Sequence, residues 1–114
     1  MQPILTVNFF RTKAGNEPVR DFLHDLTAED RKQIGEDIKT AQFGWPIGMP
    51  LIRKLDIGLW EVRCHINDGI ARVVFTVLGD RMVLLHAFVK KSQKTPANDL
   101  NTAKARLKQL KEAL

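Results

Sequence analysis

Tyrosine is absent from this 114-residue chain, and cysteine occurs once, at Cys64. A single cysteine forms no internal disulfide, so nothing indicates an oxidising compartment, and we expect a cytoplasmic protein. No apolar run approaches the roughly 20 residues that span a bilayer, and the first residues lack the basic segment and apolar core of a signal peptide. Length and composition predict one soluble globular domain over residues 1–114, with no membrane contact.

The motifs of nucleotide and metal chemistry are missing as well. There is no Gly-rich phosphate loop, and His24, His65 and His86 are too dispersed for zinc-ligand spacing. The acidic residues fall mainly in segments predicted as helices, so no carboxylate pair suggests a metal-dependent nuclease, and we expect neither metal nor cofactor. If this domain cuts a phosphodiester without metal, the substrate is RNA, whose 2′-OH attacks the adjacent phosphate. The protein would then position the strand, stabilise negative charge and move protons.

Positive charge is concentrated at the end of the chain. The net charge is +5, and residues 81–114 hold eight Lys and Arg against two Asp and Glu. This asymmetry fits a polyanionic partner or an acidic protein partner. A solvated basic helix explains the same pattern, and charge alone does not separate these readings.

Hydrophobic periodicity predicts an α+β domain. A first strand over residues 4–10 precedes two helices capped by Asn16 and Thr27. A short strand over residues 51–55 and three strand-like runs over residues 59–89 follow. Thr95 before Pro96 predicts the cap of a last helix, whose apolar stripe consists of Leu100, Ala103, Leu107, Leu110 and Leu114. We expect a small twisted antiparallel sheet, with an N-terminal helical hairpin covering one face and a C-terminal helix.

An Asp68-Gly69 turn would set the register of the central hairpin. One face then holds eight apolar residues: Trp60, Val62, Cys64, Ile66, Ala71, Val73, Phe75 and Val77. The other face has no apolar cover and groups Arg63 and His65 with Arg72, with His65 opposite Arg72. This basic group either binds an anion or consists of ordinary solvent-facing residues, with Glu61 pairing to an arginine.

The position of His86 depends on the length of the Gly79-Asp80 turn. A two-residue turn places His86 on the core face, and a three-residue turn places it on the basic face, where it could exchange protons. Three lysines follow the strand, Lys90, Lys91 and Lys94. They form either a solvated strand end or a phosphate grip close to the N-terminus of the last helix.

Three stretches carry a family resemblance: residues 58–63, residues 71–75 and, most specifically, residues 83–96. Together they resemble the RelE/ParE toxin superfamily, and most closely its HigB-type, phage-derived branch. The resemblance extends over nearly the whole chain. It implies a toxin of a bacterial type II toxin–antitoxin pair that enters the A site of the 30S ribosomal subunit and cleaves mRNA without metal.

The resemblance also implies roles for individual residues. Carried over by position, the working residues are Arg63, Arg72 and either Lys90 or Lys91. We expect catalysis from Arg63, Arg72, Lys91 and His86, and RNA binding by Arg53, Lys54, His65, Lys90 and Lys94. Arg72 and Lys91 would stabilise transition-state charge, Arg63 would position the strand, and His65 or His86 would carry the proton. The implied partner is a helix-turn-helix antitoxin, and operator DNA is reached only through it.

The chain departs from its relatives at the aromatic positions. Many relatives carry tyrosine where this chain has Trp60 and Phe75, and some use a C-terminal tyrosine in catalysis, so the general base stays open. The superfamily also contains toxins that inhibit DNA gyrase without cutting RNA. A gyrase inhibitor and a non-catalytic, prophage-derived binding module therefore remain alternatives.

Overall fold

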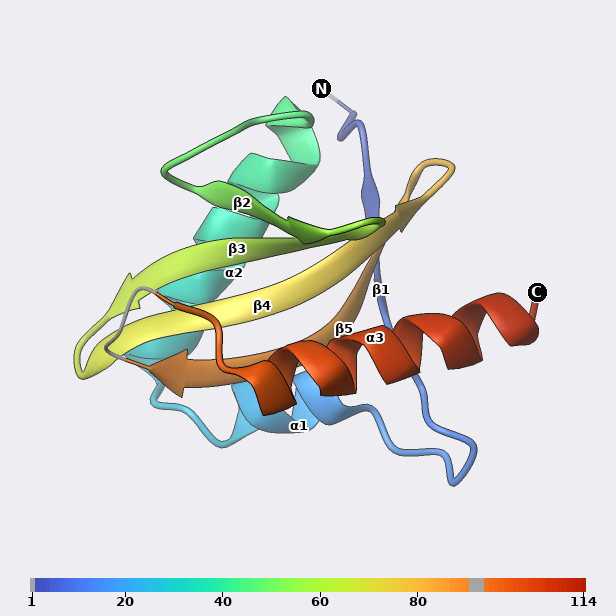
Figure 1. Ribbon diagram of the computed structural model, residues 1–114. Helices are drawn as coiled ribbons and strands as arrows, with labels where there is room; N and C mark the ends of the chain where they lie inside the picture. The colour runs from blue at the N-terminus through green and yellow to red at the C-terminus, as the bar shows by residue number, and fades with distance from the viewer. Residues whose placement is uncertain (1, 91–93) are drawn as a thin grey trace.

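The computed structural model describes residues 2–90 and 94–114, and Figure 1 shows a sheet with helices on both faces. This architecture confirms the α+β class. No helix within the described residues is both long and apolar enough to cross a membrane. In chain order the elements are β1 (Thr6–Phe9), α1 (Pro18–His24), α2 (Ala28–Gly44), β2 (Ile52–Asp56), β3 (Leu59–Ile66), β4 (Gly69–Leu78), β5 (Arg81–Lys90) and α3 (Ala97–Glu112).

The sheet is mixed, with the strand order β1-β5-β4-β3-β2. The expectation of a purely antiparallel sheet is wrong for β1, which runs parallel to β5 with Thr6 beside Arg81 and Phe9 beside Leu84. Only strands joined by a tight turn are forced to be antiparallel. The chain between β1 and β5 includes both N-terminal helices and three strands, so no local signal sets the direction of β1.

The N-terminal helical hairpin packs on the core face, as predicted. Ile34 and Ile38 of α2 join Val62, Val73 and Phe75 of the sheet in one buried cluster. The Thr27 cap is confirmed, because its hydroxyl oxygen accepts a hydrogen bond from the Asp30 N–H at 3.2 Å.

The predicted Asn16 cap is wrong. Helix α1 begins at Pro18 after Glu17, and the Glu17 side chain makes no capping hydrogen bond.

The β3–β4 hairpin has the predicted faces but not the predicted pairs. Ile66 pairs with Gly69, so Asn67 and Asp68 form the turn. The Asn67 N–H points to Asp30 Oδ1 of α2, 3.3 Å away, instead of to a strand neighbour. The expected register is wrong by two residues, and because side chains alternate with a period of two, each stays on its expected face.

The β4–β5 hairpin has a two-residue turn, one of the two lengths considered, with Leu78 beside Arg81. A β-bulge follows: Phe75 pairs with Leu84, but Val74 pairs with His86, so one extra residue stands on β5. The bulge moves His86 to the face opposite the core. The expectation that a two-residue turn places His86 on the core face is therefore wrong.

Helix α3 covers part of the face that was expected to lack apolar cover. A second buried cluster joins Ala103 and Leu107 of α3 to the sheet residues Leu59, Val74, Val83 and Leu85. The apolar stripe of α3 needs such a surface, and β4 and β5 supply it. The α3 helix crosses in front of the sheet in Figure 1, opposite α1 and α2.

Replacing Leu107 with alanine tests whether this second core holds α3 in place. Leu107 is only 7% exposed, so Leu107→Ala should lower the free energy of unfolding by about 2–4 kcal/mol in urea titrations. The exposed neighbour Lys108 provides the control, and Lys108→Ala should change it by less than about 0.5 kcal/mol. Equal effects of the two substitutions would contradict the packing of α3 on the sheet.

Candidate functional site

Three arginines surround one glutamate on the α3 side of the sheet. Arg53 of β2 lies beside Glu61 of β3, and Arg63 of β3 lies beside Arg72 of β4. We call Arg53, Arg63, Arg72 and Glu61 the arginine cluster. The expected His65–Arg72 pair is wrong. Because of the two-residue register shift, Arg63 lies beside Arg72, and His65 lies beside Ile70.

Glu61 is completely buried and connects two arginines. Its Oε2 atom lies 3.9 Å from Arg63 Nε and 3.9 Å from Arg72 Nη1. At these distances the charged groups form ion pairs, but they are too far apart for hydrogen bonds. The interpretation that Glu61 pairs with an arginine is thus confirmed, and it is compatible with anion binding because the arginines outnumber it.

Thr95 closes the cluster from the α3 side. Its hydroxyl donates a hydrogen bond to Glu61 Oε1 at 2.8 Å and accepts a longer one from Arg72 Nη1 at 3.4 Å. The predicted helix cap at Thr95 is wrong: Pro96 occupies the N-cap position, with no side-chain cap bond. Sequence reasoning missed this role because a threonine before a proline is a typical helix start.

Arg72 is as buried as Glu61. Burial lowers the pKa of its guanidinium, Glu61 raises it, and Arg63 and Arg53 lower it. A guanidinium nevertheless stays protonated in proteins. The arginine cluster therefore holds one carboxylate and three positive groups, and its excess of positive charge favours an anion.

The other basic residues predicted to bind RNA do not all lie on the same face of the sheet as this cluster. Lys90 shares its face, since Lys90 pairs with Ile70 beyond Arg72 on β4, and Lys90, Lys94 and His65 are exposed. Lys54 pairs with Trp60 and so points to the opposite face, away from the cluster. Lys91 lies outside the described residues.

His86 belongs to a separate network that joins β5 to α3. Arg106 Nη1 donates to the Leu85 carbonyl at 2.9 Å and lies 3.1 Å from His86 Nδ1. Because a guanidinium only donates, Nδ1 accepts, and the proton sits on Nε2, which donates to Asp99 Oδ1 at 2.7 Å. Both ring nitrogens are therefore occupied by α3 side chains.

Cys64 lies on the core face and is fully buried, as expected. Burial and the neighbouring Asp37 carboxylate raise the pKa of its thiol. A neutral, inaccessible thiol is a poor nucleophile. In the described part of the chain, no group of three or more His, Cys, Asp or Glu side chains could hold a metal ion.

A comparison with known protein families gives the class of protein. The family model Phage derived protein Gp49-like (DUF891) matches residues 21–108, which include β2–β5 and the whole arginine cluster. The chain therefore belongs to the phage-derived Gp49-like family, a RelE/ParE-like toxin family. Membership implies an antitoxin partner. No curated protein matches the chain significantly.

Replacing Glu61 with glutamine tests the electrostatic role of this residue. Glutamine keeps the shape but removes the charge that balances buried Arg72, so Glu61→Gln should lower the free energy of unfolding by about 3 kcal/mol. Urea titrations measure this change. The control Glu36→Gln, at an exposed position of α2, should alter stability by less than about 0.5 kcal/mol. A similarly small change at Glu61 would contradict the role of its charge.

Proposed function

We propose that this protein is the HigB-type toxin of a type II toxin–antitoxin pair. It acts in the cytoplasm as a ribosome-dependent, metal-independent mRNA endonuclease at the A site of the 30S subunit. The observation that supports this proposal is the arginine cluster, a local excess of positive charge within a RelE/ParE-like toxin fold. Its partner is a helix-turn-helix antitoxin, which also provides the contact with operator DNA.

The proposed reaction uses the nucleophile that RNA itself carries. The 2′-OH loses its proton to a base and attacks the adjacent phosphorus, which gives a 2′,3′-cyclic phosphate. The bond to the 5′ oxygen breaks, and that oxygen takes up a proton. The negative charge that builds up on the phosphoryl oxygens is what positioned guanidinium groups stabilise.

The arginines of the cluster divide this work by their exposure. The Arg63 side chain is 11% exposed and the Arg72 side chain is not exposed at all. We therefore assign direct phosphate contact to Arg63, assisted by Lys90 and Lys94. Arg72 does not touch the phosphate but acts on it through its charge, because the low dielectric constant of its buried position strengthens its electric field. Direct contact of Arg72 with a phosphate would require Thr95 to move away.

Proton transfer is best assigned to a histidine, since the chain has no tyrosine. His65 is exposed on the same face as Arg63 and two residues away along β3. His86 would first have to release Asp99 or Arg106. This difference supports His65 as the proton carrier, with His86 as the second candidate.

Replacing Arg63 with alanine tests the proposed phosphate contact. Arg63→Ala should lower the rate of mRNA cleavage by about 100-fold, measured by mapping mRNA 5′ ends after expression in a bacterial host. Circular dichroism should show an unchanged fold. The matched control Lys111→Ala, on the exposed side of α3, should cut like the wild type. Intact mRNA with double-strand DNA breaks on wild-type expression would instead indicate gyrase inhibition.

Separate substitutions distinguish the two histidines. His65→Ala should lower cleavage by about 100-fold and leave stability unchanged, because an exposed proton carrier contributes to the reaction and not to packing. His86→Ala removes two hydrogen bonds to α3, so it should lower the free energy of unfolding by about 1–3 kcal/mol in urea. Wild-type cleavage by His65→Ala together with loss of cleavage by a folded His86→Ala would reverse the assignment.

A further inference from the structure

We infer that a second surface, distinct from the arginine cluster, binds an acidic segment of a partner protein that carries apolar side chains. The surface is a groove of about 500 Å³ between the end of β1 and the last turns of α3. We call it the β1–α3 groove and define it by Phe10, Val83 and Leu110 together with Arg11, Lys13 and Arg81. The inference rests on the proposed function, because the partner it names is the antitoxin.

The floor of the groove is apolar. Phe10 is 4% exposed and Val83 is 5% exposed, so they form a packed base on which another side chain can rest. Leu114 at the rim is 83% exposed. Burial of apolar surface of this kind under a partner stabilises the complex. An aliphatic side chain of the partner would fill the groove.

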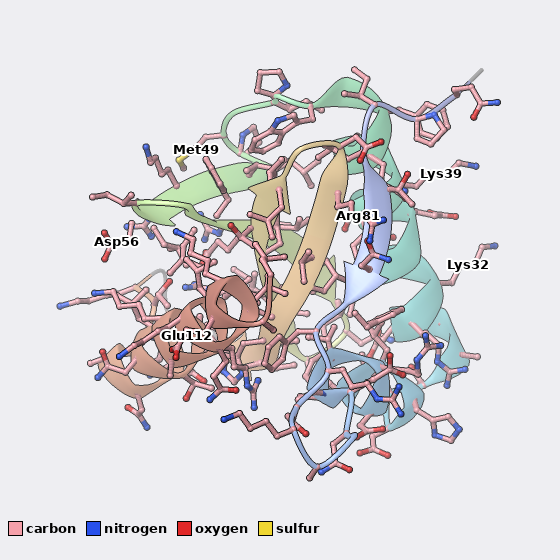
Figure 2. The ribbon with its side chains drawn as sticks, turned by 90° about the vertical axis from the view of Figure 1, so that its right-hand side faces the viewer. Lys32, Lys39, Met49, Asp56, Arg81 and Glu112 are labelled. Atoms are coloured by element: carbon pink, nitrogen blue, oxygen red, sulfur yellow. The ribbon has the colours of Figure 1, made fainter. Side chains whose placement is uncertain are left out.

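The rim of the groove is basic. Arg11 and Lys13 come from the loop after β1, and Arg81 comes from the start of β5, so two separate segments bring positive charge to one opening. All three side chains are exposed. Of the described side chains that line the groove, none is acidic. Figure 2 looks onto this side of the molecule and shows Arg81 beside β1.

This charge pattern selects the partner. Carboxylates placed around an apolar anchor would complement a basic rim around an apolar floor, and such complementarity speeds association and excludes basic segments. The groove thus predicts aspartate or glutamate on both sides of a leucine, isoleucine or valine in the bound segment.

The groove fits RNA less well than a protein segment. Single-stranded RNA binds to basic surfaces by stacking its bases on exposed rings. Phe10 is buried, and the guanidinium of Arg20 covers the Phe9 ring at 4.3 Å. The groove also lies at the β4–β5 turn, whereas His65 lies next to the β3–β4 turn at the other end of these strands.

A charge reversal in the groove provides the test. The groove variant is Lys13→Glu/Arg81→Glu. The control variant is Lys32→Glu/Lys39→Glu, which makes the same change in net charge on exposed α2 positions (Figure 2). Each protein is expressed alone and together with the product of each reading frame that flanks its gene, where the proposed helix-turn-helix antitoxin would be encoded. Isothermal titration then measures the Kd of each purified protein for that product.

All three proteins should arrest translation when expressed alone. The adjoining gene product should neutralise the wild type and the control variant but not the groove variant. The Kd of the groove variant should be weaker by about tenfold or more, and the difference should shrink at high salt.

Three results would overturn the inference. Neutralisation and affinity of the groove variant equal to those of the wild type would show that the groove does not bind the antitoxin. Loss of translation arrest by the groove variant alone would assign the groove to RNA or the ribosome instead. If neither flanking gene product neutralises an active wild type, the proposed antitoxin partner is excluded. A wild type that does not arrest translation contradicts the proposed function, and the measured affinities still decide the role of the groove.

Discussion

The buried carboxylate of Glu61 is the interaction on which the α3 side of the molecule depends. Arg72 is fully buried beside it, and Arg63 and Arg53 lie close by. A buried guanidinium without a counter-charge costs several kcal/mol. Glu61 supplies that charge and, through Thr95, also fixes the segment that leads into α3. One side chain therefore links the charge of the sheet to the position of the helix above it.

The two faces of the sheet serve different purposes because different helices cover them. Helices α1 and α2 bury the apolar face in one core. Helix α3 forms a second core over β4 and β5, with the arginine cluster beside it and the exposed His65 and Lys90 beyond it. Positive charge is therefore held on a rigid sheet, which positions charged groups better than a loop does.

Sequence patterns predicted the parts of the fold that follow from local periodicity. The assignment of β3 and β4 side chains to faces survived a register error, because a shift of two residues preserves alternation. The bulge on β5 left no short-range signal, so the expected link between turn length and the face of His86 was wrong. The direction of β1 was wrong for a similar reason, since no tight turn connects it to β5.

The candidate site was predicted less completely than the fold. Arg63 and Arg72 were found because alternation placed them on one face, and the structure brings them side by side. The cover by α3 and the role of Thr95 were missed, since both depend on contacts between segments far apart in the sequence. The face of Lys54 could not be predicted because its strand, β2, gave no register of its own, and pairing with Trp60 puts it on the face opposite the cluster.

Cleavage of mRNA on the ribosome is the activity that we propose for the arginine cluster. The most direct measurement incubates the purified protein with a defined mRNA, with and without programmed ribosomes, and maps the new 5′ ends by primer extension. We expect cuts within the codon at the A site when ribosomes are present, and strong loss of these cuts in Arg63→Ala. Intact mRNA on programmed ribosomes, together with inhibition of DNA supercoiling by purified gyrase, would contradict it.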